Sequence, residues 1–418
     1  MKHVIVGNGV AGVTAARGIV RADPSAEVHI FGFEPYPYYR RPLLWEFIAG
    51  QIERHALYFR PLDWYAGRSI QLHLGARVTG LDPVGHRLDV EVSGGRPASA
   101  RSVEYDRLLL ATGGRPFVPP CEGVEKDGVF TLRTLDDALA IKAYARKAST
   151  AIVIGGGLLG LETARALRTT GLKVTVIEFF PHLLPRQLDA QGAEVLQSLL
   201  EAQGLKIVTG GKTEAVFGDG RAKGVRLQDR RVIAGEMVIF STGIRSEVAL
   251  ARAAGFEVNR GIVVNERLQT SADDIFAVGD AAEFEGRVYG IIPAAIEQAR
   301  VAAASMVASG SAVYAGTLPT TTLKVAGAEL TSVGESVAEA EDCEQLRRVD
   351  LAAGRYRKLV LRGGRIVGAI SLNDRERARL ITRLIEGGVD VSAYGNRLLD
   401  DDFDLKSLLH RNDSEEVY

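Results

Sequence analysis

The chain has 418 residues, a formal net charge of −1 and 46 glycines. A chain this long exceeds what one hydrophobic core usually organises, so two or three domains are expected. A charge this close to zero gives no indication of a nucleic-acid or membrane-surface partner. No run approaches the ~20 apolar residues that span a bilayer, so we expect no membrane span.

The only cysteines are Cys121 and Cys343, which form neither a Cys-x-x-Cys redox pair nor a metal cluster. We therefore predict no metal site and assign any redox chemistry to a bound cofactor. Residues 1–6 lead directly into a glycine motif, so we expect no secretory signal. Both observations favour a cytoplasmic location.

The first chemical motif follows a short apolar strand predicted at residues 4–6. It reads Gly7-Asn8-Gly9-Val10-Ala11-Gly12 and precedes an Ala-rich helix and a second strand at residues 28–31. In such a turn the first glycine permits the bend, the second lets the backbone approach a diphosphate, and the third lets helix pack on strand. The alternative is a glycine-rich turn without a ligand.

The same unit recurs in mid-chain. A strand at residues 151–154 leads into Gly155-Gly156-Gly157-Leu158-Leu159-Gly160, then a helix at residues 161–170 and a strand at residues 173–177. Each βαβ unit implies a parallel sheet. Each is also followed by an apolar strand that ends in a small residue, Thr and Gly. These two endings are Ala111-Thr112-Gly113 and Ser241-Thr242-Gly243.

The fold class predicted is α/β, with two doubly wound three-layer dinucleotide-binding domains, one inserted in the other, and a small α+β C-terminal domain. We place the outer domain at residues 1–118 and 246–315, the inserted domain at 119–245, and the C-terminal domain at 316–418. In the last of these, residues 358–370 predict a β-hairpin around Gly363-Gly364, and residues 374–386 an Arg-rich helix. Residues 412–418 are polar and predicted to fray.

A third motif, residues 270–280, is a turn and an apolar strand that ends in Gly279-Asp280. The glycine lets the backbone approach a ligand, and the aspartate can accept a hydrogen bond from a sugar-like hydroxyl. The residues from Ala281 can begin a helix, so the alternative for Asp280 is a helix N-cap.

With these motifs the sequence resembles the pyridine nucleotide–disulfide oxidoreductase superfamily over roughly residues 1–320. Tyr38-Tyr39-Arg40-Arg41-Pro42-Leu43-Leu44 is similar to a segment of rubredoxin and ferredoxin reductases. Phe31-Gly32-Phe33-Glu34-Pro35 and Leu323-Lys324-Val325 resemble the N-terminal flavin module of nitrite reductase large subunits. NAD(P)H–rubredoxin oxidoreductases share this layout, including a small C-terminal domain.

The resemblance places FAD at the first glycine motif. Glu34 would hold the adenosine ribose, Val78 would contact adenine through its backbone, and Lys324 would stabilise negative charge on the reduced flavin as a catalytic cation. The alternative for Lys324 is a solvated strand end. The residues implied at the FAD site are Gly7, Gly9, Val10, Ala11, Gly12, Glu34, Arg41, Pro42, Val78, Ala111, Thr112, Gly113, Asp280, Ile291 and Lys324.

The resemblance places NAD(P)H at the second motif, with Glu162 reaching the nicotinamide side of the flavin as a catalytic residue. Glu178 ends the second strand, where an acid accepts hydrogen bonds from a ribose and repels a 2′-phosphate, so NADH is favoured. Arg186 lies close enough in sequence to leave NADPH open. The residues implied are Gly155, Gly157, Leu158, Leu159, Gly160, Glu162, Glu178 and Gly243.

The function predicted is an FAD-dependent NAD(P)H oxidoreductase, in which a hydride passes from nicotinamide to flavin and electrons leave singly. The partner would be a small rubredoxin- or ferredoxin-like carrier, or a partner subunit, and a homodimer stays open. Two alternatives are an NADH oxidase and a flavin-binding structural or redox-sensing subunit. Neither the cysteine pair of disulfide reductases nor the single flavin-side cysteine of peroxidases is present, and Trp45 replaces a usual Ser.

A local excess of basic residues in the C-terminal region suggests a docking site for an acidic carrier. The alternative is that Asp400, Asp401, Asp402 and Asp404 neutralise these residues within the domain. The basic residues are Arg347, Arg348, Arg355, Arg357, Lys358, Arg362, Arg365, Arg375, Arg377, Arg379 and Arg383.

Overall fold

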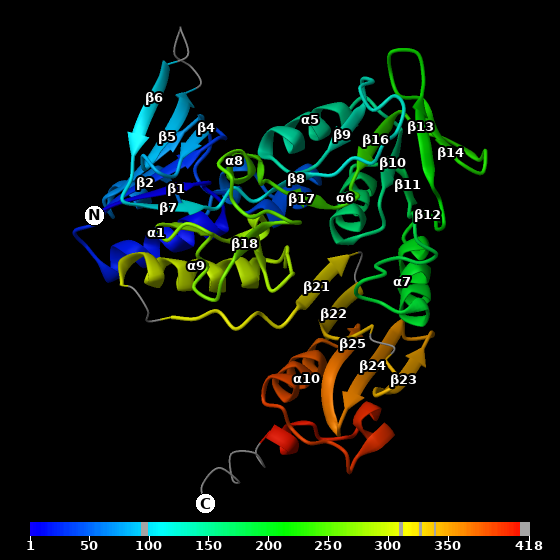
Figure 1. Cartoon of the computed structure of the whole chain (residues 1–418). Coiled ribbons are helices and arrows are strands. Elements are labelled where there is room, and N and C mark those ends of the chain that lie inside the picture. Colours follow the sequence, from blue (N-terminus) through cyan, green and yellow to red (C-terminus); the bar gives the residue numbers. More distant parts are fainter. Residues whose placement is uncertain (93–98, 309–311, 326–327, 338–339, 410–418) are drawn as a thin grey trace, which may run out of the picture. The chain divides into compact units, whose positions relative to one another are not determined.

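A computed structural model describes residues 1–92, 99–308, 312–325, 328–337 and 340–409 (Figure 1). The chain forms two compact units. The first contains Met1–Phe47, Ile52–Pro116 and Ile244–Thr317, and the second contains Ile48–Gln51, Phe117–Gly243 and Leu318–Tyr418. The separation of residues 119–245 from 316–418 as distinct domains stays a prediction, as do the exact domain boundaries. Residues 412–418 lie outside the described residues.

A five-stranded parallel sheet forms the centre of the first unit, in the order β19-β7-β1-β2-β3. The middle strands β1 and β7 end in buried apolar runs, residues 4–6 and 108–110, which is typical of parallel strands covered on both faces. The strands are β1 (Lys2–Val6), β2 (Glu27–Gly32), β3 (Ile70–Leu74), β7 (Arg107–Leu110) and β19 (Ile275–Ala277).

Helices α1 (Val10–Ala22) and α9 (Ile292–Val307) pack along each other beside this sheet (Figure 1). Gly18 permits their close approach, because a Cβ there would lie 2.8 Å from the Cβ of Ala303. An antiparallel sheet of β4 (Ala76–Asp82), β5 (Arg87–Val92) and β6 (Ser99–Glu104) adds to the same unit.

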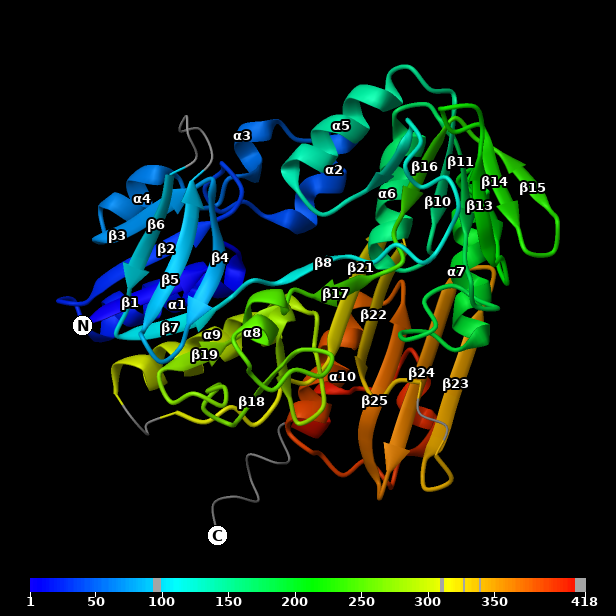
Figure 2. The same cartoon turned by 45° about the horizontal axis from the view of Figure 1, so that its top comes forward.

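Short elements complete the first unit. The segment between β2 and β3 contains four of them, and α4 lies against β3 (Figure 2). They are η1 (Arg41–Leu43), α2 (Leu44–Ile48), α3 (Arg54–Leu57) and α4 (Leu62–Ala66). The others are β8 (Gly114–Pro116), β17 (Ile244–Ser246), α8 (Ala249–Ala253), β18 (Ile262–Val264), η2 (Gly279–Ala281) and β20 (Ala282–Phe284).

The second unit contains another five-stranded parallel sheet, in the order β12-β11-β10-β16-β9. The strands are β9 (Val129–Thr131), β10 (Thr150–Ile154), β11 (Lys173–Ile177), β12 (Lys206–Val208) and β16 (Met237–Phe240). Its helices are α5 (Leu135–Ala145), α6 (Leu158–Thr169) and α7 (Ala190–Ala202), and a small antiparallel sheet is formed by β13 (Thr213–Phe217), β14 (Gly224–Leu227) and β15 (Val232–Ala234). The predicted α/β class with two parallel sheets is confirmed.

The C-terminal part of the second unit is an antiparallel sheet with one helix, as predicted. The sheet order is β21-β22-β25-β24-β23. The strands are β21 (Thr320–Val325), β22 (Ala328–Gly334), β23 (Glu344–Asp350), β24 (Arg355–Arg362) and β25 (Arg365–Leu372), followed by α10 (Arg375–Glu386) and η3 (Gly395–Leu399). Buried Ala378, Ile381 and Leu384, spaced three residues apart, place one face of α10 on the core.

A buried polar cluster ties this C-terminal sheet to α7. Asp189 caps α7 by accepting from the Gly192 amide at 3.0 Å, and it also accepts from the Tyr356 hydroxyl at 2.7 Å. Lys358, with no exposed surface, lies 3.3 Å from the same carboxylate. Burial alone would raise the pKa of Asp189, but these hydrogen bonds and the Lys358 charge hold it below its ordinary value.

Two predicted helix starts need correction. The helix expected from residue 161 begins at Leu158, directly after Gly157, because its first turn uses the last residues of the glycine motif. The helix that residues from Ala281 could have begun, which was the alternative for Asp280, is absent. Instead η2 ends there, and β20 follows because residues 282–284 pair with β18 in a parallel ladder. No helix of the described residues is long and apolar enough to cross a membrane.

Candidate functional site

The first glycine turn combines two crowded glycine positions with one open position, which is the construction that can hold a diphosphate. Gly7 has a φ of +118°, and a Cβ on it would lie 2.1 Å from the Ala111 carbonyl oxygen. A Cβ on Gly12 would lie 2.0 Å from the Gly7 carbonyl oxygen. Around Gly9, by contrast, no atom lies within 4 Å of a Cβ position. Two glycines therefore close the turn, and the third leaves open space at the start of α1.

The second glycine turn repeats this construction. Gly155 has a φ of +115°, and its Cβ position lies 2.3 Å from the Ser241 carbonyl oxygen. The Cβ position of Gly160 lies 2.0 Å from the Gly155 carbonyl oxygen, and that of Gly157 has nothing within 4 Å. Leu158 and Leu159 begin α6 after the open position, as Val10 and Ala11 begin α1. We call the two turns, residues 7–12 and 155–160, the first and second cradle.

The acid after the first cradle is held by side chains. The Glu34 carboxylate accepts from Arg41 Nη2 at 2.5 Å and from the Tyr39 hydroxyl at 2.5 Å. Burial disfavours the charge of Arg41, but neighbouring Tyr39, Glu34 and Asp280 outweigh it and raise its pKa. Three of the predicted FAD residues, Glu34, Arg41 and Asp280, are therefore electrostatically coupled within the first unit.

The acid after the second cradle is held by backbone amides. Glu178 is 5% exposed, and it accepts from the Gly156 amide at 2.6 Å and from the Phe180 amide at 2.9 Å. A Cβ on Gly156 would lie 2.5 Å from Leu183 Cδ2 and 3.0 Å from the carboxylate itself. A Cβ at Gly156 would therefore displace the Leu183 side chain or the Glu178 carboxylate, a constraint that the sequence pattern did not show.

The Gly279-Asp280 turn depends on a residue that the sequence analysis missed. Gly279 has a φ of +73°, and its amide donates to Gln298 Oε1 at 2.8 Å. Gln298 is 1% exposed and lies on α9, whose N-cap is Ile291. The turn is therefore the short 3-10 helix η2, held by a hydrogen bond from α9, and Asp280 is not the N-cap of a following α-helix. The Ala-Ala-Ile-Glu-Gln pattern of α9 carried no sequence signal for this contact.

Comparison with known proteins agrees with this geometry. A family model of pyridine nucleotide-disulphide oxidoreductases matches residues 1–305. The chain belongs to this family. The C-terminal part of this oxidoreductase, residues 319–389, matches the rubredoxin NAD+ reductase C-terminal domain. The predicted resemblance and the two cofactors that the family uses, FAD and NAD(P)H, are confirmed.

Three relatives illustrate the range. Nitrite reductase [NAD(P)H] of Bacillus subtilis is 37% identical over 390 residues, which are 93% of this chain and 48% of that protein. An NADH oxidase of Methanocaldococcus jannaschii is 32% identical over 370 residues, 86% of this chain and 81% of that protein. Putidaredoxin reductase, in its covalent complex with putidaredoxin, has a TM-score of 0.87 at 28% identity and covers 99% of both chains. The oxidoreductase spans about half the length of several curated relatives.

The two similar strand endings, Ala111-Thr112-Gly113 and Ser241-Thr242-Gly243, each contact one of the cradles. Ala111 and Ser241 place their carbonyl oxygens against the first glycine of each cradle. The Thr112 hydroxyl donates to the Glu247 carbonyl at 2.6 Å, and the Thr242 hydroxyl donates to the Phe117 carbonyl. Gly113 and Gly243 follow with φ values of +71° and +98°.

The remaining predicted residues lie on known elements, but their roles stay predictions. Val78 lies in β4 where the ladder to β5 shifts register, and Pro42 lies exposed in η1. Glu162 lies in the second turn of α6. Lys324 lies in β21 of the second unit, 56% exposed, with its Nζ 3.2 Å from Glu329 Oε1. Among the described residues, no three metal-ligating side chains gather at one place.

The first cradle is also braced by a tyrosine that the sequence did not single out. The Tyr65 hydroxyl donates to Asn8 Oδ1 at 2.9 Å and accepts from the Tyr38 amide at 3.2 Å. Asn8 Nδ2 in turn donates to the Tyr36 carbonyl at 3.3 Å. Burial raises the pKa of Tyr65 to about 12, so its hydroxyl keeps its proton at neutral pH. Asn8, between the first two glycines of the motif, therefore anchors the turn to α4 through Tyr65.

Proposed function

We propose that this oxidoreductase takes electrons from NADH through FAD and passes them to a small iron–sulfur or rubredoxin-type carrier, or to a partner subunit. The observation that carries the proposal is the pair of cradles, built alike in separate units, of which one is coupled to a Gly-Asp turn. We assign FAD to residues 1–118 and 246–315, and NADH to residues 119–245.

The residues present fit these cofactors. The open positions at Gly9 and Gly157 would let the backbone amides approach a diphosphate, and Arg41 would balance its charge. Asp280 would accept a hydrogen bond from the ribityl chain. Bound FAD would supply the conversion of a two-electron reduction into single-electron transfers. The chain's own part is to hold the two dinucleotides and set the charge around them.

NADH rather than NADPH is favoured by Glu178. Its two oxygens each accept one backbone amide, which leaves further lone pairs for the hydroxyls of a ribose. A 2′-phosphate would meet the buried Glu178 carboxylate, while the exposed Arg186 nearby in sequence keeps NADPH as the alternative. Exposed Phe179 and Phe180 follow directly in the sequence.

Two observations support a carrier as acceptor. The C-terminal part matches a rubredoxin reductase domain, and one solved relative of similar fold and full coverage is a reductase in a covalent complex with putidaredoxin. The half-length match to nitrite reductase favours a partner subunit or a further domain in the same role.

An NADH oxidase is the second candidate, supported by the 32% identical relative from Methanocaldococcus jannaschii. A third candidate function is that of a flavin-binding structural or redox-sensing subunit. We also propose a cytoplasmic location, which the free Cys121 and Cys343 favour, and a homodimer as the assembly to test.

The test is direct. Purified protein should be yellow, hold one non-covalent FAD per chain, and be bleached by NADH in rapid mixing. The reduced protein should then reduce a rubredoxin or ferredoxin faster than dioxygen. A well-folded protein that takes up no FAD would refute the proposal, and dioxygen as the faster acceptor would favour the oxidase.

A further inference from the structure

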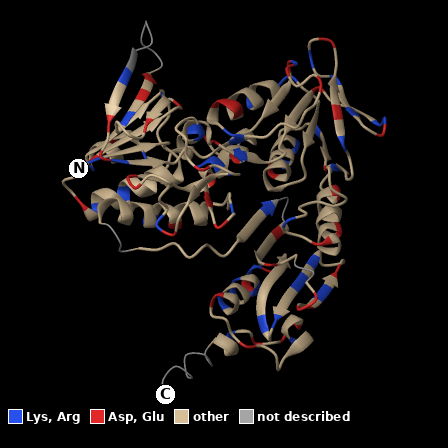
Figure 3. Cartoon of the chain, viewed as in Figure 1, with Lys and Arg blue, Asp and Glu red and all other residues tan. Residues whose placement is uncertain are grey.

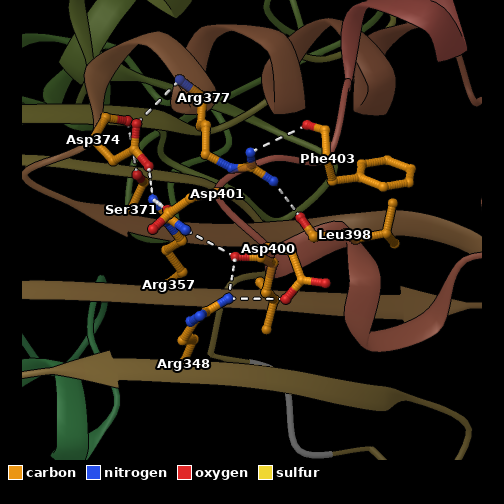
Figure 4. A network of polar contacts seen from close by, with 10 residues as sticks. Arg348, Arg357, Ser371, Asp374, Arg377, Leu398, Asp400, Asp401 and Phe403 are labelled. Atoms are coloured by element: carbon orange, nitrogen blue, oxygen red, sulfur yellow. Dashed lines mark hydrogen bonds and ion pairs between the residues drawn. The ribbon is translucent and has the colours of Figure 1, made fainter.

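The Arg-rich C-terminal region contains ion pairs within its own unit, the alternative that the sequence analysis left open. Arg348 pairs with Asp400 at 2.9 Å, and Arg357 pairs with Asp374 at 2.6 Å and Asp401 at 2.5 Å (Figure 4). Basic and acidic residues are interspersed over these elements (Figure 3). Docking of a carrier on this region stays a prediction. The basic residues of the region that are exposed and have no ion pair among the described residues are Arg355, Arg365, Arg379 and Arg383.

A cavity of about 480 Å³ lies in the first unit, between the parallel sheet and the antiparallel sheet. Residues of β1, β2 and β3 line one side of it, and residues of β5 and β6 line the other (Figure 2). None of the lining residues belongs to a cradle or was assigned to FAD or NAD(P)H. A space of this size is typical of a small-molecule site. We call it the flank cavity, with Lys2, His29, His73 and Arg101 among its lining residues.

The parallel register places polar side chains on the sheet face that borders the flank cavity. His29 pairs with Gln71, and Phe31 pairs with His73, in the β2–β3 ladder. Residues two apart in a strand share a face, so these four side chains stand together. The His73 ring stacks on the Phe31 ring at 4.5 Å and on the His29 ring at 5.3 Å. Two histidines are unusual on this face, because covered parallel strands normally carry apolar residues.

A relay of hydrogen bonds connects β6 with β2 through these histidines. Arg101 Nη2 donates to His73 Nδ1 at 3.1 Å, because a guanidinium has no acceptor. His73 therefore carries its proton on Nε2 and donates to His29 Nδ1 at 3.0 Å. His29 Nε2 in turn donates to the Glu27 carboxylate at 2.6 Å. Both imidazoles are neutral in this arrangement, and burial together with the Arg101 charge lowers the pKa of His73 to about 4.

The relay holds Arg101 toward the flank cavity. Arg101 stands two residues before buried Val103, so both side chains point to the same face of β6. Its guanidinium carbon lies 5.6 Å from the centre of the Phe31 ring, and one N–H bonds His73. A guanidinium has five N–H donors, so the others are available to a ligand.

The flank cavity carries positive charge that is only partly compensated. Arg101 on β6 and Lys2 on β1 have no ion pair among the described residues. Arg87 also lines the cavity, but it pairs with Asp82 at 3.5 Å. It also lies opposite Glu104, the acidic residue of the lining, in the β5–β6 ladder. Arg101 and Lys2 are therefore the two cations open to an anionic ligand.

We propose that the flank cavity binds the phosphate group of a small molecule, held by Arg101 and Lys2. The planar guanidinium matches the oxygens of a phosphate group, and the ammonium adds a point charge. Gln71 and Ser102 line the same cavity with neutral donors. Free phosphate and a small phosphate ester present the same group. The volume of the cavity favours the ester, because phosphate alone would fill only a part of it.

The experiment uses the full chain loaded with FAD and saturated with NAD+, so that both cradles are occupied. Calorimetric titration at fixed ionic strength measures binding of inorganic phosphate, glycerol phosphate and citrate. Glycerol phosphate should bind at one site per chain and raise the melting temperature, because a ligand stabilises the form that binds it. Arg101→Gln should weaken this binding at least about tenfold, since a charge-assisted bond is lost. Arg101→Lys should recover a part of the affinity.

Lys2→Gln should also weaken binding, and it changes no residue of the relay, so it keeps the test open if Arg101→Gln fails to fold. The matched control is Arg300→Gln, an exposed arginine on α9 of the same unit, which should bind like the wild type. Equal affinity for phosphate and glycerol phosphate would identify free phosphate as the ligand. Tighter binding of citrate than of either would overturn the phosphate assignment. Absence of binding by the wild type, or equal losses in the Arg101 or Lys2 variants and in Arg300→Gln, would overturn the site.

Discussion

The two cradles share one backbone construction but set their acids differently. In both, two glycines are forced by a carbonyl oxygen 2.0 to 2.3 Å from a Cβ position, and the glycine between them is left open. Glu34 is held by the side chains of Arg41 and Tyr39, whereas Glu178 is held by two backbone amides. The turn thus follows from sterics alone, while the charge beside it depends on which neighbours the surrounding fold supplies.

This difference has an electrostatic consequence. At the first cradle Glu34 is paired with the Arg41 guanidinium, and these two charges largely cancel each other. Asp280 also acts on Arg41 through its charge. The Glu178 carboxylate is 5% exposed, and its two donors are the neutral backbone amides of Gly156 and Phe180. We therefore expect discrimination between ligands by charge at the second cradle and retention of a tightly held ligand at the first.

The largest effects are expected from the glycines that close each cradle. Gly12→Ala should yield protein without FAD, because the new Cβ would meet the Gly7 carbonyl. Gly160→Ala should keep FAD but slow its reduction by NADH at least about 100-fold, since small misplacements cost that much. Visible absorbance and rapid mixing measure both.

Gly9→Ala and Gly157→Ala are the controls, since no atom lies within 4 Å of either Cβ position. Both should leave the melting temperature of the ligand-free protein unchanged and weaken binding of FAD or NADH alone. Unchanged NADH binding in Gly157→Ala would show that the open space is not where a diphosphate lies.

Acid should destabilise the first sheet more than the second. Burial, the N-terminal ammonium and Arg107 lower the pKa of His3 from 6.5 to about 4, and His73 is lowered to about 4 as well. The unfolded chain binds more protons between these values, so stability is lost as pH falls from about 6.5 to about 4. For His3 this amounts to at most about 3 kcal/mol.

His3→Phe should flatten this dependence, because both ring nitrogens of the buried histidine are without hydrogen-bond partners among the described residues. Urea midpoints near neutral pH and at about pH 5 measure it. The strands of the second parallel sheet contain no histidine. A fluorescent probe placed on that sheet should therefore report a smaller change in unfolding midpoint with pH. Equal acid sensitivity of wild type and variant would contradict the assignment.

The Gly-Asp turn belongs to the first cradle alone, so its loss should affect only flavin. Asp280→Ala should weaken FAD retention by roughly 1–3 kcal/mol, since a buried hydroxyl loses its acceptor. Gln298→Leu should act in the same direction by freeing the Gly279 amide. FAD dissociation constants from fluorescence measure both, with NAD+ affinity as the control. A matching loss of NAD+ affinity would point to general misfolding.

The smallest effect expected is on cofactor preference. Glu178→Gln keeps acceptors for the Gly156 and Phe180 amides but removes the charge, and should cut the preference for NADH over NADPH roughly tenfold. Glu178→Arg should reverse the preference at some cost in stability, because the Gly156 amide loses its partner. Faster reduction of the wild-type flavin by NADPH would show that Glu178 does not select NADH.

Much of the fold was readable in sequence because it rests on local rules. The apolar strands, the glycine positions and the hairpin at Gly363-Gly364 were predicted, since sterics and alternating burial act within a few residues. The strand at residues 173–177 even has the predicted bounds. Family membership followed from the same motifs.

Contacts between distant residues were decided only by the tertiary structure. No helix begins at Ala281, because residues 282–284 pair with β18 in a ladder, and Gln298 reaches the Gly279 turn from another element. The sequence left open whether the C-terminal arginines form a docking surface or pair within the domain, and the structure pairs Arg348 with Asp400 and Arg357 with Asp401. Sequence determined where glycine, charge and apolar runs stand. Which charges meet depended on long-range packing, because Coulomb energy and burial follow distance in space rather than in the chain.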